Sequence, residues 1–250
     1  MRDKSLILVF AIIGFTFITG CKKSGTKLNS DLKISFQTTV NGTDYGIGDS
    51  YKNDLGVEIT YELFQFYLSD IEIHNSDGEK RLISEIELFK FNSNGIANLD
   101  FKVPHGNYEK ISFGIGVKAT LNDADPSNYA EDGHPLSTTQ NTYWGWVGKY
   151  RFVMAEGRYD SDGDGTIDGT FAYHTGYNVS YRTLNLNHNF EIDKKSANTL
   201  NFNIDLKKLL DNPGNEIIIS ETPFYHGAAE DEHLTIKLSD NFQSSISITE

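Results

Sequence analysis

The feature that most constrains the fold is a period-two alternation of apolar and polar residues, which recurs in short segments from residue 32 onward. Two examples are KISFQTTV at 33–40 and LISEIELFKF at 82–91, and each is followed closely by an Asn-Gly pair that favours a tight turn. Successive side chains of a strand point to opposite faces, so this pattern predicts strands with one buried face. The same interpretation applies to YEKISFGIGVK, KYRFVMAEGRY, TLNFNIDL, NEIIIS and LTIKL.

Together these segments predict an all-β fold, a single β-sandwich of immunoglobulin-like or jelly-roll-like type, with long loops at one end and at most one short helix. The segment 57–74 is long enough for a helix, but its Ile, Tyr, Phe and Leu content favours one bent strand or two joined strands. A helical turn is predicted at 205–214, with Asp205 as its cap and a Pro-Gly pair as its stop. The polar segment 122–141 is predicted to be a loop at one end of the sandwich.

The first residues resemble an export signal. Arg2 and Lys4 precede an apolar run that is too short for a membrane span with a stop-transfer flank, so residues 1–20 are predicted to be a signal peptide. The segment ITGC at 18–21 resembles the lipobox of bacterial lipoproteins, in which the signal is cut before a cysteine that becomes acylated. We therefore predict lipidation at Cys21. The alternative is a plain signal peptide followed by a stray cysteine.

The organisation of the rest of the chain follows from that anchor. Residues 21–31 are polar and lack apolar periodicity, so they are expected to form a lipidated flexible tether, and residues 32–250 to form the sandwich domain. Cys21 is the only cysteine, so no disulfide is expected and the fold must depend on burial. We expect a protein of the bacterial cell envelope, bound to the lipid bilayer of the outer membrane on a face that the sequence leaves open.

The charge of the chain argues against nucleic acid as a partner. The sequence has 35 acidic and 22 basic residues, a formal net charge of -13. Loss of the predicted signal removes Arg2, Asp3 and Lys4, a net +1, and so leaves -14. An acidic surface repels phosphate backbones, so nucleic-acid binding is not expected.

An acidic loop stands out in the segment YDSDGDGTIDGTFAYHTG at 159–176. Its oxygen-bearing residues take positions 1, 3, 5, 7 and 9 of an EF-type calcium loop, with Gly165 at position 6, where the chain must turn sharply. Phe171 stands at position 12, where a bidentate Glu is expected, so the loop resembles the shorter calcium loops of extracellular repeat proteins. The predicted calcium ligands are Asp160, Asp162, Asp164, Thr166 and Asp168. The alternative is an acidic, solvated hairpin turn.

Five longer segments resemble the MbnP-like family in their order and approximate spacing. They are FYLSDIEIHN, HGNYEKISFGIGV, YWGWVGKYRFVMAEG, FAYHTG and LNFNIDLKKLL, and the resemblance covers most of residues 34–241. Members of this family are secreted or lipid-anchored β-proteins related to the copper-binding partner encoded beside methanobactin genes. The resemblance implies a copper-binding protein.

In that family copper is held by histidine nitrogens, sometimes with a tryptophan oxidised to kynurenine, and imidazole suits copper well. The positions that match the family's motifs are Trp144, Trp146 and His174. His74, which follows the YLSDIEI segment, and His134, in the loop before the tryptophans, are further possible ligands. The remaining histidines are each interpreted as solvated or capping residues, although two of them flank an acidic run that could form a second surface metal site; they are His105, His188, His226 and His233.

Two other functions remain open at this point. From the residues alone, a Trp-x-Trp pair on a strand places both indoles on one face, where they could be a packing pair or a stacking platform for a surface glycan-binding or adhesion module. A hydrolase would need a poised base, and Glu156 is its candidate. No Gly-x-Ser-x-Gly segment is present, so we predict a metal-binding or metal-delivery protein and no enzyme.

Overall fold

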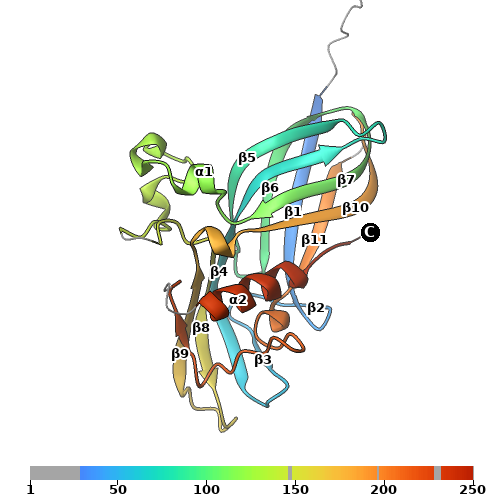
Figure 1. The fold of residues 1–250 in the computed structure, drawn as a ribbon. Coiled ribbons are helices and arrows are strands. Elements are labelled where there is room, and N and C mark those ends of the chain that lie inside the picture. The colour runs from blue at the N-terminus through green and yellow to red at the C-terminus, as the bar shows by residue number, and fades with distance from the viewer. Residues whose placement is uncertain (1–28, 146–147, 196, 228–231, 250) are drawn as a thin grey trace, which may run out of the picture.

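The structure is a computed structural model that describes residues 29–145, 148–195, 197–227 and 232–249. The predicted signal peptide, Cys21 and Trp146 lie outside the described residues. Two β-sheets form a sandwich-like arrangement, so the all-β fold class expected from the sequence is confirmed (Figure 1). Within the described ranges, no helix is both long and apolar enough to cross a membrane.

The first sheet consists of β1 (Asn29–Val40), β2 (Thr43–Asp44), β6 (Ile96–Pro104), β11 (Asn198–Asp205) and β13 (Ile246–Ile248). At its centre, β1 pairs in parallel with β11 and antiparallel with both β6 and β2. The Asn-Gly turn that was predicted after KISFQTTV connects β1 to β2. β1 begins at Asn29, and its first three residues pair with β6, so these residues belong to the sheet and not to the predicted tether at 21–31.

The second sheet consists of β3 (Ser50–Lys52), β4 (Glu58–His74), β5 (Lys80–Lys90), β7 (Gly106–Ile115), β8 (Val153–Asp160), β9 (Gly169–Thr175), β10 (Arg182–Ile192) and β12 (Phe224–Tyr225). Its order is β10-β7-β4-β8-β9-β12, and β3 and β5 also pair with β4. The segment predicted to be one bent strand or two is the single strand β4. Its pairing with β7 is irregular between Ser69 and Glu72, where Asp70 has a positive φ of 47°.

The main core lies between the two sheets and is rich in aromatic rings. Phe36 of β1 stacks on Phe202 of β11 and meets Phe66 and Phe89 of the second sheet edge to face, at centroid distances of 5.3 and 5.0 Å. All four rings are buried. Burying a Phe side chain contributes about 1.5–3 kcal/mol, so this cluster helps to hold the two sheets together.

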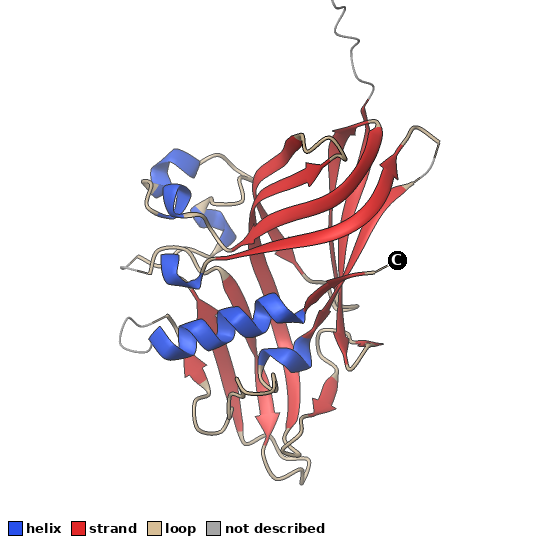
Figure 2. Cartoon of the chain, turned by 45° about the vertical axis from the view of Figure 1, so that its right-hand side comes forward, coloured by secondary structure: helices blue, strands red, loops and turns tan. Residues whose placement is uncertain are grey.

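A second, smaller core orders the long loop that was predicted at 122–141. The hydroxyl of Tyr67 donates to the carbonyl of Pro135 at 2.7 Å, and that of Tyr150 donates to the carbonyl of Leu136 at 2.8 Å. Val117 and Phe152 are buried in the same cluster. α1 (Ala119–Asn122) leads into this loop, and the loop contains the 3₁₀ turns η1 (Pro126–Tyr129) and η2 (Thr138–Gln140). These short helical pieces lie together beside the strands (Figure 2).

The helical turn predicted at 205–214 is present as the 3₁₀ turn η4 (Leu206–Leu209), and the Asp205 side chain accepts from the backbone N–H of Lys207. A longer helix, α2 (Glu232–Ser245), was not predicted, and LTIKL, which was expected to be a strand, lies inside it. The helical pattern can be recognised only over a stretch longer than LTIKL. In that stretch Leu234, Leu238 and Phe242 are buried at a spacing of four, as on one face of a helix.

The segment NEIIIS was also expected to be a strand, but it forms no ladder and is not a strand in the structure. Its alternation is real, since Ile217 and Ile219 are buried while Ile218 is 41% exposed. The backbone N–H of Ile217 bonds to the carbonyl of Leu210 just after η4. An alternating pattern therefore buried the right side chains here without any strand partner.

Candidate metal centre

The β8–β9 hairpin and the short strand β12 bring the candidate site together. In the hairpin, Met154 lies opposite His174, and Glu156 lies two pairs further along, opposite Ala172. β12 runs parallel to β9 with Tyr225 opposite Tyr173, which places the next residue, His226, beside His174. Three segments that are distant in the sequence therefore converge at one position.

His174 is held from both ends of its ring. Its Nε2 lies 2.7 Å from Oε1 of Glu156, and its Nδ1 lies 3.0 Å from Nδ1 of His226. We assign the proton of His174 to Nε2, which can donate to this carboxylate oxygen, so that Nδ1 keeps a lone pair directed at His226. Glu156 thus fixes both the tautomer and the orientation of the ring, as outer carboxylates do for metal-binding histidines.

The imidazole of His174 is held in its neutral form. The side chain is 5% exposed, and burial lowers its pKa to about 4, although the hydrogen bond to Glu156 acts in the opposite direction. Arg151 and His226 lower this pKa further. At neutral pH the ring is therefore uncharged and can donate a nitrogen lone pair to a metal ion without first losing a proton.

Trp144 covers this histidine pair. Its ring centroid lies 6.1 Å from that of His174 and 6.5 Å from that of His226, and the guanidinium of Arg151 lies 5.8 Å from its centre. The indole fits a slot lined by glycines, because a Cβ at Gly148 would lie 2.6 Å from the ring. Trp144 is 7% exposed, so it shields the site from solvent.

The position of Trp144 differs from the predicted one. It was expected on a strand with Trp146, but it lies in the loop before β8, next to an isolated bridge between Tyr143 and Tyr150. Its backbone N–H donates to the carbonyl of Lys149. The residues that the sequence reasoning did not assign to this site are His226 and Glu156. Neither residue has a local sequence pattern that predicts a place in this site. His226 reaches the site through the pairing of β12 with β9, and Glu156 through the pairing of β8 with β9.

The structure places the other predicted copper ligands elsewhere. His74 ends β4, where its Nε2 bonds to the hydroxyl of Ser112 at 2.8 Å. It is nine residues along β4 from Gln65, which pairs with Met154, a separation of about 30 Å in an extended strand. His134 stacks on Tyr129 at 5.0 Å and accepts from the N–H of Leu136, two residues of its own loop.

The acidic loop lies at the turn of the same hairpin, as expected. Asp160 is 2% exposed, and its carboxylate accepts from the backbone N–H groups of Gly163 at 2.7 Å and Gly165 at 2.8 Å. Burial alone would raise the pKa of Asp160, but these backbone donors outweigh it and lower the pKa. The pKa of Asp168 is also lowered, because Ser161 donates to it. Both carboxylates are therefore held ionised.

Three of the five predicted calcium ligands come together. Single carboxylate oxygens of Asp160, Asp162 and Asp168 all lie within 4.8 Å of one another. Asp164 is outside this group, and its carboxylate accepts from the N–H of Thr166 at 2.7 Å. Ile167, the apolar residue at position 8 of the loop, is 50% exposed and so does not anchor the loop to the core.

Comparisons with known proteins agree with this architecture. The family model MbnP matches residues 29–228. The chain is also similar to a solved structure, MbnP from Methylosinus trichosporium, with a TM-score of 0.54, 16% sequence identity, and coverage of 81% of this chain and 82% of that chain. At this identity the likeness concerns the fold alone. Among curated proteins, no sequence matches.

Proposed function

Because the chain belongs to the MbnP family, we propose that it binds a copper ion at the Nδ1 atoms of His174 and His226. The observation that carries this proposal is the 3.0 Å separation of these two nitrogens, with a carboxylate on the far side of one ring. Imidazole nitrogen is a ligand that copper prefers, and a carboxylate behind it raises its basicity. Metal binding or delivery follows as the role, without turnover.

The residues fit a metal ion. Metal–imidazole bonds are about 2.0–2.1 Å long, so one ion can reach two nitrogens that lie 3.0 Å apart. His174 is neutral and buried, while His226 is exposed and offers a path from solvent. The two Nδ1 atoms would hold the ion. Glu156 keeps the proton on the far nitrogen of His174, and Trp144 excludes water from one side.

The other functions lose support at specific residues. The hydrolase hypothesis used Glu156 as a base, but this carboxylate is engaged with His174 at 2.7 Å. The glycan-binding alternative used the tryptophans as a stacking platform, but Trp144 is 7% exposed and packs against Gly148 and His174. A buried indole cannot stack on a sugar. Trp146 lies outside the described residues.

Copper binding is tested by titrating the mature protein with copper and measuring bound metal after gel filtration. We expect one copper per chain in the parent. Replacing His174→Ala or His226→Ala should weaken binding by at least roughly 100-fold, since loss of even an outer-shell partner typically costs 10–100-fold. His134→Ala is the matched control, because its ring is engaged with Tyr129 and Leu136 away from the His174 site, and it should bind copper as the parent does. Unchanged affinity in His174→Ala would contradict the proposal.

We also propose that a calcium ion closes the β8–β9 turn at Asp160, Asp162 and Asp168. Like charges on three carboxylates within 4.8 Å would repel one another, and a hard dication with oxygen ligands would relieve that repulsion. The role would be structural. The turn lies on the hairpin that carries His174, so a cation here would support the copper site from a distance.

Finally, we propose that the domain is tied to the bacterial cell envelope through acylated Cys21. The support is the lipobox-like segment that ends at the single cysteine of the chain. β1 begins at Asn29, so the intervening link would be short and would keep the sandwich close to the bilayer of the outer membrane.

A further inference from the structure

Tyr177, which follows the end of β9 close to His174, has a strained backbone. Its φ is 62° and its ψ is 154°, a combination that is essentially restricted to glycine. Among the described residues, the other non-glycine positions with positive φ are polar or charged: Asn41, Asp70, Asn141 and Lys149. Backbone strain of this kind persists only where the surrounding packing enforces it, and it tends to occur at functional sites.

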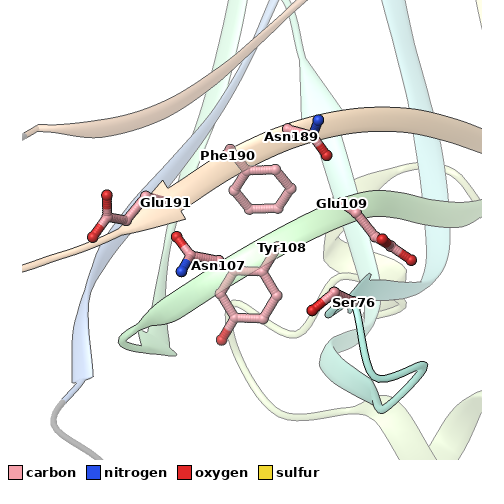
Figure 3. A pocket seen from close by; sticks show the side chains of 7 residues that line it. All are labelled: Ser76, Asn107, Tyr108, Glu109, Asn189, Phe190 and Glu191. Atoms are coloured by element: carbon pink, nitrogen blue, oxygen red, sulfur yellow. The ribbon is translucent and has the colours of Figure 1, made fainter.

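Aromatic rings elsewhere in the fold reach their partners without such strain. Tyr108 of β7 is paired with Phe190 of β10, and their rings stack with centroids 5.3 Å apart (Figure 3). Neither residue has a positive φ. A glycine at position 177 would adopt the observed conformation freely, so the contacts of the tyrosine ring must compensate for the strain.

The ring of Tyr177 lies against two glycines that also contact Trp144. A Cβ at Gly227 would lie 3.2 Å from Cε2 of Tyr177 and 3.5 Å from Cζ3 of Trp144. A Cβ at Gly148 would lie 3.5 Å from Cε2 of Tyr177 and 2.6 Å from Cε3 of Trp144. Both aromatic side chains therefore border the space beside Gly227, which is too narrow for a larger residue.

Gly227 directly follows His226, which lies beyond the end of the sheet. β12 ends at Tyr225, and its ladder with β9 joins only two residue pairs. The His226 side chain is exposed, yet its Nδ1 lies 3.0 Å from Nδ1 of His174. Gly227 is buried and has a φ of 63°. The backbone next to His226 is therefore fixed on one side by the short ladder and on the other by the packing of Gly227.

We propose that Tyr177 is a positioning residue for His226: its ring, together with that of Trp144, clamps Gly227 and so holds the His226 imidazole against that of His174. This inference rests on the proposed copper site, in which the two Nδ1 atoms hold the ion. A ligand that is already in place loses less conformational freedom when the metal binds, so the clamp raises the affinity for copper. The strain at Tyr177 is the cost of placing an aromatic ring at this point.

The first test uses the metal-free mature protein. Nuclear magnetic resonance should show an Overhauser contact between the rings of His174 and His226, whose centroids are 4.9 Å apart. Tyr177→Phe keeps the aromatic ring and should keep this contact. Tyr177→Gly removes the ring and also relieves the backbone strain, so we expect a folded protein in which the contact between the two imidazoles is lost.

The second test is a copper titration of the same proteins. Tyr177→Gly should weaken copper binding by roughly 10–100-fold, the loss that is typical when a residue supporting a metal ligand is removed, whereas Tyr177→Phe should bind like the parent. Gly227→Ala is a second variant that keeps the tyrosine. Its added Cβ would crowd Cε2 of Tyr177 at 3.2 Å, so it should displace His226 and weaken binding as well.

Asn41→Gly is the matched control. It also places glycine at a position of positive φ, but in the turn between β1 and β2 of the other sheet, so ring contact and copper affinity should match the parent. A parent that binds no copper would contradict the proposed function, and the metal-free spectra would still decide whether Tyr177 holds His226. The inference is overturned if the parent shows no ring contact, if Tyr177→Gly keeps it, or if Tyr177→Gly loses it but binds copper as tightly as the parent.

Discussion

At the scale of single residues, the environment of His174 decides its chemistry. An exposed imidazole exchanges its proton between two nitrogens, whereas this one has its Nε2 proton directed to Glu156 and its Nδ1 lone pair directed to His226. The choice between a structural histidine and a ligand therefore depends on a carboxylate that stands eighteen positions earlier in the chain.

One prediction concerns that carboxylate. Glu156→Gln keeps an oxygen acceptor for His174 but removes the charge that makes the imidazole more basic. We expect copper affinity to fall by roughly 10–100-fold, while the metal-free variant melts close to the parent. Competition with a chromophoric copper chelator measures the affinity. The control is Glu62→Gln, an exposed carboxylate on β4; a Glu156→Gln protein with parental affinity would show that Glu156 does not support the ligand.

A second prediction concerns pH in the metal-free protein. The pKa of His174 is about 4 when folded, below its ordinary value of 6.5, because burial disfavours the charged form. The unfolded chain therefore binds more protons between these values, so the free energy of unfolding decreases as pH falls from about 6.5 to 4, by at most about 3 kcal/mol.

Urea unfolding at several pH values checks this expectation. Many carboxylates also titrate in this range, so the informative quantity is the difference between the parent and His174→Asn, which lacks the buried imidazole. The variant should show a shallower loss of stability on acidification. Equal slopes for both proteins would indicate that His174 titrates alike in the folded and unfolded states.

At the scale of elements, the β8–β9 hairpin carries both proposed metal sites, one at its turn and one near its open end. Hairpin geometry follows from local alternation, and the Asp-Gly-rich turn is a local signal too. The partner strand β12 has no such local signal, since it has only two residues and pairs in parallel with β9 from a distant segment of the chain. Its pairing decides that His226 joins the site.

The turn gives a prediction of its own. If calcium binds only the folded loop, a chelator should lower the melting temperature of the parent, by roughly 2–4 °C per kcal/mol for a domain of this size. The double variant Asp162→Ala plus Asp164→Ala should melt at the same temperature with and without chelator. Calorimetry of copper-free protein, with calcium restored as a control, measures the effect. A parent that melts identically in chelator and in calcium would rule out a structural cation.

α2 is the element whose structure differs most from the prediction made from its sequence pattern. Phe242 on this helix contacts Phe66 at 5.0 Å and Phe64 at 5.8 Å, so the helix packs against the aromatic core of the second sheet. Five residues of LTIKL fit a strand as well as a helix, and only the longer spacing of four, continued to Phe242, distinguishes them. The helix covers core rings of the second sheet that would otherwise be exposed, and this requirement comes from the sandwich as a whole and not from the LTIKL segment.

At the scale of the whole molecule, the proposed anchor sets where these sites operate. Cys21→Ser should move the protein from the membrane fraction to the soluble fraction of cells, because a lipid chain holds a protein to a bilayer by its buried methylenes. Fractionation with immunodetection measures this, and the control is Ser24→Ala in the same segment. A Cys21→Ser protein that stays in the membrane fraction would contradict lipid anchoring.

The sequence by itself determined many local features of this protein: most of the strands, though not NEIIIS or LTIKL, the Asn-Gly and Asp-Gly turns, the Asp205 cap and the acidic loop. These depend on residues within a few positions of one another, so period, turn chemistry and capping predict them. The resemblance of longer segments also identified the family and directed attention to Trp144 and His174.

Only the tertiary structure decided the pairing of β1 with β11, the docking of α2, and the meeting of His174 with Glu156 and His226. It also placed His74 and His134 away from the His174 site. In the second sheet it paired Tyr108 with Phe190 next to a β-bulge. The reason is physical: side-chain alternation states which face of a strand is buried, but which strand lies next to it depends on burial summed over the whole chain.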